Sequence, residues 1–413
     1  MVFLAIDKDK TKNLIEDIEK LFKTVSKPIP KEGRRFIEKK VMGPIFDEVN
    51  KLIGESRPPV IFLVGRSGHG KSSLLNALAN RDIAEVGDIK PTTTETVPYE
   101  INFEDRYASW NVIDTRGIFE TTKPDGALGD DAIKILRRDI VKYKPDIILH
   151  VVAASEIRNL SNDLKVFDDL IQSLEKETGV APPTIVALNK VDTLGNPRNW
   201  PPSTSPEKTY LIKESLNYMA RDIIGADVQK VDANDSTRGY KTLGGNYKGV
   251  IPICSLKGDL WNVESLSDLI GSHLPDEALI DFFQAQERRE QLKRLSSSII
   301  NRFSTIAGTI GASPVPIADI LILTPIQLLM VSIVGGLSCR EFKKETAYEY
   351  LAAAGLNVGA AFGLRTVAHQ LMKLIPIAGW AGSGAIAASG TYAIGKSAET
   401  YFFLGEMKKP EIE

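Results

Sequence analysis

The hydrophobic pattern of this 413-residue chain changes twice along its length, which divides it into three parts. In residues 1–55 apolar side chains recur at spacings of three to five, the period of amphipathic helices, with a break at SKPIPKEG (26–33). From Pro59, short apolar runs bounded by Gly, Pro and Asp alternate with amphipathic stretches. That alternation is typical of β-α repeats around a mostly parallel sheet. After Pro275 the strand pattern stops and a helical pattern continues to about residue 404.

The alternation after Pro59 predicts individual elements. Strands are predicted at 60–65, 97–103, 108–113, 146–153, 184–189 and 250–255. Helices are predicted near 71–79, 130–143, 160–177, 207–223 and 263–273. We therefore predict a three-layer α/β domain over residues 56–276. An all-helical domain is expected from residues 277–413 together with the N-terminal helices of residues 1–55.

Composition and charge narrow the class of protein. Hydrophobic residues make up 43% and charged residues 25%, the usual balance for a chain that buries a core. The formal net charge of -2 gives no electrostatic case for binding nucleic acid. Two cysteines cannot form a disulfide framework, and the apolar run of MVFLAIDKDK is too short for a signal-peptide core. We therefore predict a cytoplasmic location.

The segment after the first predicted strand has the spacing of a phosphate-binding loop. Residues 65–72, GRSGHGKS, match G-x-x-x-x-G-K-[ST] between a strand and a helix. The glycines let backbone N–H groups face phosphates, Lys71 supplies a positive charge, and the helix N-terminus adds its dipole. The predicted nucleotide contacts here are Gly65, Arg66, Ser67, Gly68, His69, Gly70, Lys71, Ser72 and Ser73.

A second motif selects the base. The sequence NKVD (Asn189, Lys190, Val191, Asp192) ends a later hydrophobic strand. A carboxylate at Asp192 can accept from the N1–H and 2-amino groups of guanine, which adenine lacks. Such a site rejects adenine because its own polar group would be left unpaired. The pair of motifs therefore predicts a guanine nucleotide, GTP or GDP.

Three further segments complete the predicted site. The sequence DTRG follows a strand, and there Asp114 is predicted to hold Mg²⁺ while the Gly117 amide contacts the γ-phosphate. A threonine of PTTTET, Thr94 in preference to Thr93, is predicted to reach Mg²⁺ and the γ-phosphate. The backbone amides of Ser255 and Leu256 are predicted to face guanine O6. The expected metal ligands are Ser72, Thr94 and Asp114.

The motif set GRSGHGKSS, PTTT, DTRG, NKVD and CSLK resembles the Era-like branch of translation-factor-type P-loop GTPases. Residues 310–404 resemble the YcjF-type domain that follows many bacterial Era-like GTPases. The layout is also similar to that of immunity-related GTPases. These resemblances imply a P-loop G domain, GTP hydrolysis with Mg²⁺, and a trailing helical domain.

The sequence departs from the resemblance at the catalytic position. Ile118 follows DTRG, where many GTPases have a glutamine that orients water, and Gly68 stands where potassium-activated relatives have asparagine. The catalytic candidates are then Lys71, Thr94, Gly117 and His69, with Arg66 or another group acting across a G-domain dimer. Packing within the loop is the favoured role of His69. We predict slow intrinsic hydrolysis that a dimer or a partner accelerates.

Two long stretches raise the question of a membrane. Ile320–Cys339 and Leu374–Gly395 contain no charged residue and are long enough to span a bilayer. The first contains Pro325, and the second is rich in Gly and Ala and so only weakly hydrophobic. Soluble helical packing is favoured over peripheral contact at the inner face of a membrane, and both over an integral hairpin.

We predict a GTP-hydrolysing switch that couples nucleotide state to the helical domain, with a homodimer or an effector protein as partner. One alternative is a dynamin- or immunity-type GTPase that assembles on membranes. A second is a guanine-nucleotide-dependent module for ribosomes or RNA, which the lack of a basic patch disfavours.

Overall fold

The computed structural model describes residues 55–83, 97–115, 130–312, 318–340, 343–354 and 384–410, except 107, 160, 180 and 409, with isolated positions and short runs between 13 and 50. The chain divides into two compact units. The sheet unit contains Pro58–Ile101 and Ser109–Pro275. The helical unit contains Met1–Arg57, Asn102–Ala108 and Asp276–Glu413.

The sheet has the order β2-β3-β1-β4-β5-β8-β7-β6 within the described residues. Its strands are β1 (Val60–Val64), β2 (Val97–Phe103), β3 (Ala108–Asp114), β4 (Ile147–Ala153), β5 (Thr184–Asn189), β6 (Val228–Lys230), β7 (Tyr240–Thr242) and β8 (Tyr247–Pro252). β1 pairs in parallel with β3 and β4, and the parallel pairing continues through β5 to β8. β7 and β6 extend the sheet in antiparallel fashion.

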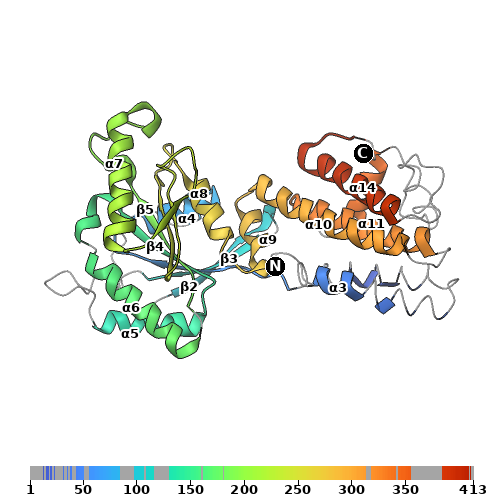
Figure 1. Ribbon diagram of the computed structural model, residues 1–413, viewed down its shortest axis with the longest axis horizontal. Helices are drawn as coiled ribbons and strands as arrows, with labels where there is room; N and C mark the ends of the chain where they lie inside the picture. The colour runs from blue at the N-terminus through green and yellow to red at the C-terminus, as the bar shows by residue number, and fades with distance from the viewer. Residues whose placement is uncertain are drawn as a thin grey trace. The chain divides into compact units, whose positions relative to one another are not determined.

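Helices cover both faces of this sheet (Figure 1). They are α4 (Lys71–Ala79), α5 (Asp130–Tyr143), α6 (Ser161–Thr178), α7 (Pro206–Asn217) and α8 (Val263–Gly271). Alternate strand residues such as Phe62 and Val64 are fully buried in a core shared with α5, α6 and α7. α4 and α8 contact each other on the other face. Because successive strand residues point to opposite faces, strands buried on both sides need apolar residues, which β1 has throughout and β4 has at every position except His150.

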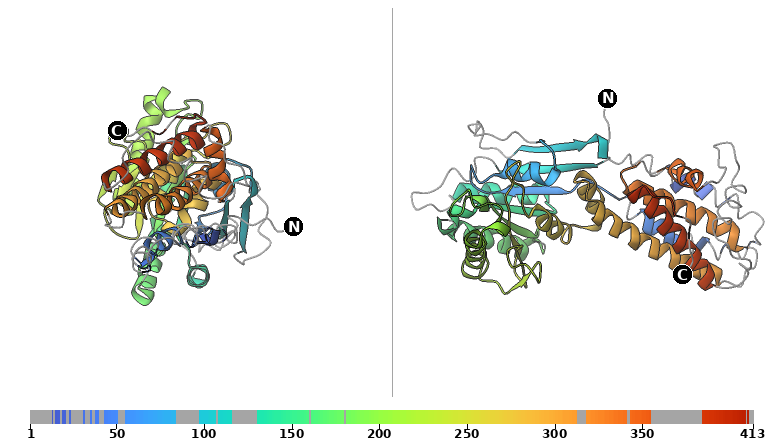
Figure 2. Two further views of the ribbon diagram at one scale, coloured as in Figure 1. Left: turned by 90° about the vertical axis from the view of Figure 1, so that its right-hand side faces the viewer. Right: turned by 90° about the horizontal axis from the view of Figure 1, so that it is seen from above.

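The helical unit is built around three long helices that lie side by side (Figure 2). Its helices within the described residues are α3 (Gly43–Val49), α9 (Asp276–Ala285), α10 (Arg289–Gly311), α11 (Ala318–Leu337), α12 (Lys344–Ala353) and α14 (Gly384–Leu404). α10 and α14 approach closely, since a Cβ at Gly384 would lie only 2.4 Å from the carbonyl oxygen of Gly308. The predicted fold class, a P-loop α/β domain with an all-helical domain, is confirmed.

The long uncharged stretch of the helical unit is mostly internal. Every residue from Leu323 to Leu337 of α11 is buried in the protein. Among the described residues, no helix combines the length and hydropathy needed to cross a membrane. Of the second predicted stretch, residues 374–383 lie outside the described part of the chain.

The turn between β2 and β3 belongs to the helical unit, although sequence analysis places it within residues 56–276. Its centre is Arg106, which is 5% exposed. The Arg106 guanidinium donates to the carbonyl oxygen of Ala285 at the end of α9 and lies 3.5 Å from the Glu287 carboxylate. It also lies over the ring of Phe103, at 5.9 Å from the centroid. A strand connection of the α/β part of the sequence is thus part of the helical core.

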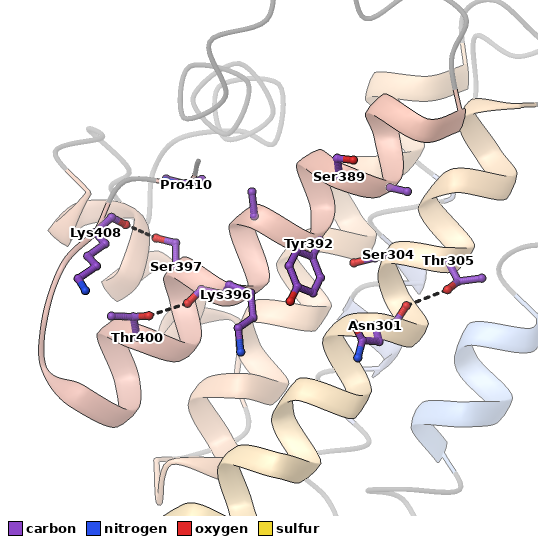
Figure 3. A pocket seen from close by; sticks show the side chains of 12 residues that line it. Asn301, Ser304, Thr305, Ser389, Tyr392, Lys396, Ser397, Thr400, Lys408 and Pro410 are labelled. Atoms are coloured by element: carbon purple, nitrogen blue, oxygen red, sulfur yellow. Dashed lines mark hydrogen bonds between the residues drawn. The ribbon is translucent and has the colours of Figure 1, made fainter. Parts of the chain in front are cut away.

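A cavity of about 810 Å³ opens between α10 and α14 in the helical unit (Figure 3). Hydroxyl and amide groups line much of it: Asn301, Ser304, Thr305, Ser389, Tyr392, Ser397 and Thr400. Its two lysines are each near a carboxylate, Lys396 with Glu399 and Lys408 with Glu406. Each ammonium group that lines the cavity therefore has a carboxylate within 4 Å.

Candidate functional site

The loop of residues 65–70 connects β1 to α4 and depends on two glycines for its shape. Gly65 has a φ of 149°, and a Cβ there would lie 2.3 Å from the carbonyl oxygen of Val151 on β4. Gly70 has a φ of 89°, and a Cβ there would lie 2.4 Å from Nδ2 of Asn189. Both distances are shorter than real carbon contacts. The neighbouring strands β4 and β5 therefore pack directly against the loop backbone, which leaves no room for a side chain at Gly65 or Gly70.

Lys71 begins α4 and turns its side chain back into this loop. Its Nζ donates to the carbonyl oxygens of Gly65 at 2.7 Å and Arg66 at 3.2 Å, and the side chain is 8% exposed. Ser72 and Ser73 follow in the first turn of α4, partly buried. The ammonium group and the N-terminal amides of α4 thus converge at one place, an arrangement suited to an anionic phosphate.

Asn189, the last residue of β5, connects the loop to a second motif. Its Nδ2 donates to the carbonyl oxygens of His69 at 2.9 Å and Gly70 at 3.4 Å. Its Oδ1 accepts from the Ser255 hydroxyl at 2.9 Å. The side chain is fully buried, so these bonds have no competition from water. One carboxamide therefore joins the phosphate-binding loop to the segment after β8.

The predicted base-recognising residues lie next to this junction. Lys190 is left-handed with a φ of 60°, and its Cε would lie 3.8 Å from a Cβ at Gly70. Asp192 stands in the short turn η6 (Val191–Thr193) and hydrogen-bonds the thiol of Cys254. Burial, reinforced by that bond, raises the pKa of the Cys254 thiol to about 12. Leu256 follows two residues later, 55% exposed. NKVD and CSLK therefore meet beside the loop.

Asp114 is placed beside the loop by strand register. It is the last residue of β3 and pairs with Leu63 of β1, two residues before Gly65. Its side chain is 5% exposed. The Thr115 hydroxyl donates to the Leu63 carbonyl oxygen at 2.9 Å and fixes the direction in which the chain leaves the strand. The other predicted γ-phosphate contacts, Thr94 and Gly117, and with them Ile118, lie outside the described residues.

Two catalytic candidates are held by contacts within the same chain. His69 is 1% exposed, with Nδ1 3.1 Å from the Val151 carbonyl oxygen and Nε2 3.1 Å from the Glu156 carboxylate. Burial lowers the pKa of His69, and the bond to Glu156 opposes that effect. The guanidinium of Arg66 donates twice to the buried Asp163 carboxylate, at 3.0 and 2.8 Å. These contacts favour a packing role for His69 and tie Arg66 to α6.

Two buried residues near the site were not predicted from sequence. His150 on β4 lies beneath the loop, and burial lowers its pKa to about 3. Lys208 on α7 is 1% exposed and contacts the NKVD turn. A histidine within the apolar run DIILHVVA is the only sequence signal for the first, and the sequence around Lys208 offers none.

The residues present fit a magnesium ion of the phosphate-bound kind. Among the described residues, no group of three or more His, Cys, Asp and Glu side chains gathers to hold a metal by protein ligands alone. Magnesium at a nucleotide site instead takes one or two protein oxygens together with water and phosphate oxygens. The Ser72 hydroxyl, in the first turn of α4, and the Asp114 carboxylate, at the end of β3, are oxygens of the kind that such an ion takes.

Comparison with known sequences decides the class of domain. The sequence profile of the family described as 50S ribosome-binding GTPase matches residues 60–190. This part of the chain is a GTPase G domain. The match covers the phosphate-binding loop, Asp114 and the first two residues of NKVD, all of which the structure brings to one edge of the sheet.

Curated relatives match the same G domain. The tRNA modification GTPase MnmE of Mesoplasma florum is 38% identical over 139 residues, covering 32% of this chain and 29% of that protein. GTPase Der of Deinococcus deserti is 36% identical over 140 residues, covering 34% of this chain and 28% of that protein. The chain thus spans less than a third of the length of either relative.

Solved structures are similar at lower identity. Era in complex with MgGDPNP and a segment of 16S ribosomal RNA aligns with a TM-score of 0.33 and 20% identity, covering 61% of this chain and 68% of that one. Toc33 from Arabidopsis thaliana aligns with a TM-score of 0.32 and 15% identity, covering 63% and 94%. With TM-scores this low, neither structure bears on what the G domain binds.

Proposed function

We propose that this chain is a GTP-binding and GTP-hydrolysing molecular switch with slow intrinsic turnover. The observation that carries the proposal is the side chain of Asn189. It bonds the phosphate-binding loop through His69 and Gly70, and it bonds the segment after β8 through Ser255. A ligand whose phosphates lie in the loop would therefore have its base beside Asp192.

Roles follow from this placement. The loop amides from Gly65 to Ser73 and the Lys71 ammonium would bind the phosphates. Asp192 would accept from guanine, and the Ser255 and Leu256 amides would face its O6. Ser72, Thr94 and Asp114 are the proposed protein ligands of Mg²⁺, which would offset the negative charge of the phosphates.

Slow turnover is supported by what His69 and Arg66 already contact. Both are committed to partners in their own chain, Glu156 and Asp163, and residue 118 is an isoleucine that cannot orient water. We propose that a G-domain homodimer or an effector protein supplies the missing group. If the homodimer supplies it, turnover per molecule should rise with protein concentration, and in either case fast turnover in dilute protein alone would contradict this part.

Coupling to the helical unit is supported by the chain path between β2 and β3. β2 follows the segment that holds Thr94, and β3 leads directly to Asp114. The turn between them belongs to the helical unit, where Arg106 bonds Ala285. We propose that nucleotide-dependent ordering around Thr94 and Gly117 acts on the helical unit through this connection.

Nucleotide preference tests the proposed function most directly. The wild-type chain should bind GDP with at least a hundredfold preference over ADP, because the adenine base leaves Asp192 unpaired. Asp192→Asn should shift the preference from guanine to xanthine nucleotides, whose 2-oxo group accepts where guanine donates. Calorimetric titration with GDP, XDP and ADP measures all three affinities, and equal binding of GDP and ADP by the wild type would refute the function.

A second function is favoured by the names of the relatives. The matched family is described as ribosome-binding, and the MnmE relatives modify tRNA, whereas the sequence analysis predicts that nucleic acid is not a partner. A guanine-nucleotide-dependent ribosome or RNA module is thus the alternative, and salt-dependent RNA binding in GDP and in a GTP analogue would identify it.

The other finer assignments remain proposals. They are the YcjF-type identity of residues 310–404, the boundaries 1–55, 56–276 and 277–413, and a cytoplasmic location. Soluble packing of the helical domain is favoured there over peripheral contact at the inner face of a membrane. Co-sedimentation with anionic vesicles, with and without a GTP analogue, tests that contact and the dynamin- or immunity-type mechanism.

A further inference from the structure

Lys208 is a buried lysine bound to the turn that carries Asp192. Its Nζ donates to the carbonyl oxygen of Asp192 at 2.7 Å and also to that of Leu194. The whole residue is 1% exposed. Neither bond goes to a carboxylate, so the ammonium is held by backbone oxygens of the turn η6 and the residue after it.

The position of Lys208 is fixed by its own helix. α7 begins at Pro206, and the Ser205 hydroxyl accepts from the Lys208 amide at 3.2 Å as the helix cap. The Thr209 hydroxyl donates to the Pro202 carbonyl oxygen at 2.8 Å, which ties the first turn of α7 to the preceding loop. A capped helix start therefore aims the lysine at the NKVD turn.

The rest of the turn is held by hydrogen bonds that do not involve Lys208. The Val191 amide donates to the Ile253 carbonyl oxygen at 3.3 Å, and the Thr193 hydroxyl donates to the Lys190 carbonyl oxygen at 2.7 Å. The first bond holds the turn against the residue that follows β8, and the second closes the turn on itself. The carbonyl oxygens of Asp192 and Leu194 instead accept from Lys208.

Burying an ammonium group is unfavourable, and the pKa of Lys208 is lowered chiefly by this desolvation. The negative charges of Asp192 and Glu207 oppose the shift. A side chain needed only to fill space here would be more stable without a charge. The charge at this place is explained if the carbonyl dipoles of the turn have to be held in one orientation.

From this geometry we propose that Lys208 is a positioning residue for guanine recognition. It holds the backbone of Asp192 so that the carboxylate, beside the Cys254 thiol, meets both donors of the guanine edge. The proposal rests on the proposed function, because it assumes that Asp192 recognises guanine. Lys208 itself contacts only the turn, and its effect on the ligand passes through Asp192.

Affinity for two related bases separates positioning from general stability. Inosine keeps the N1–H of guanine and lacks the 2-amino group, so the ratio of GDP affinity to IDP affinity measures how well Asp192 meets its second donor. Lys208→Met keeps the length of the side chain and removes the ammonium. It should lower the GDP-to-IDP ratio at least fivefold, and Lys208→Arg should restore most of it.

Lys248→Met is the matched control. Its Nζ also donates to a backbone carbonyl, that of Gly245 at 2.8 Å, in the turn before β8. This variant should keep the wild-type ratio. If Lys208→Met does not fold, Lys208→Gln replaces it. The glutamine side chain has a neutral donor but is shorter than lysine and carries no charge, so the same fall in the GDP-to-IDP ratio is expected.

The outcomes distinguish the positioning role of Lys208 from the proposed function on which it rests. A wild-type chain that binds GDP and ADP equally refutes the proposed function. A wild-type chain that prefers GDP, with a folded Lys208→Met or Lys208→Gln protein that loses affinity for GDP and IDP to the same degree, overturns only the positioning role. A fall confined to GDP, reversed by arginine, supports it.

Discussion

The acid stability of the sheet unit should depend on His150, which lies under the phosphate-binding loop. His150 is 2% exposed on β4, and the Tyr247 hydroxyl lies 3.3 Å from its Nδ1. Burial, together with smaller electrostatic effects of His69 and Lys71, lowers its pKa from 6.5 to about 3. The folded protein therefore keeps this imidazole neutral at a pH where the unfolded chain protonates it.

The sign and size follow from proton linkage. Because the folded pKa is depressed, the contribution is complete above pH 6.5 and is lost progressively as the pH falls towards 3. Between pH 7 and pH 5 the unfolded chain gains about three quarters of a proton that the folded chain does not. Linkage then lowers the free energy of unfolding by about 2 kcal/mol over this range.

The variant that isolates this effect is His150→Asn, which keeps a hydrogen-bond acceptor near the position of Nδ1 and does not titrate. Urea unfolding of nucleotide-free protein, followed by tryptophan fluorescence at pH 7 and pH 5, gives the two free energies for each protein. The wild type should lose about 2 kcal/mol more than the variant over this interval. His273→Asn controls for loss of an imidazole outside the sheet. Equal losses for wild type and His150→Asn would show that His150 is not held neutral, and the reasoning would fail.

Two further substitutions test the loop and the strand connection. Gly70→Ala should weaken GDP binding at least tenfold, because its Cβ would displace the Asn189 carboxamide. Gly68→Ala is the control: it also lies at positive φ, but no atom lies within 4 Å of its Cβ, so it should lower the affinity for GDP much less. Equal GDP titration curves for the two variants would contradict this. Arg106→Met should destabilise the helical unit by about 1–3 kcal/mol, since it leaves the buried Ala285 carbonyl without its charged donor. Hydrogen exchange of α9 measures the change, Arg106→Lys should recover part of it, and unaltered protection would show that the contact is unimportant.

Much of the sheet unit was predictable because its signals are local. β1 is a continuous apolar run, β4 is one apart from His150, and β5 is apolar between its end residues Thr184 and Asn189. The phosphate-binding loop has a fixed spacing between a strand and a helix. β6 and β7 were missed because Val228–Lys230 and Tyr240–Thr242 are short, largely polar and lack a hydrophobic face. β7 pairs with β8 and β6 pairs with β7, and these neighbours come together only in the folded sheet.

The roles of residues whose hydrogen-bond partners lie far away in the sequence were not predictable. Lys208 and Arg106 are charged residues in polar surroundings, a pattern that normally indicates an exposed surface. Each becomes buried because a backbone carbonyl from a separate element accepts its protons. The partners of His69 and Arg66 are likewise about 90 residues away, so the sequence left their roles open where the structure shows bonds to Glu156 and Asp163.

The single carboxamide of Asn189 has a thermodynamic consequence for any ligand with two halves. A fragment that binds only in the loop fixes His69 and Gly70, and through Asn189 it also restrains Ser255. The entropy cost of ordering these shared residues is then already met by the first fragment when the second fragment binds. Pyrophosphate and guanosine, added as separate molecules, should therefore each raise the affinity for the other, by the same factor in both directions.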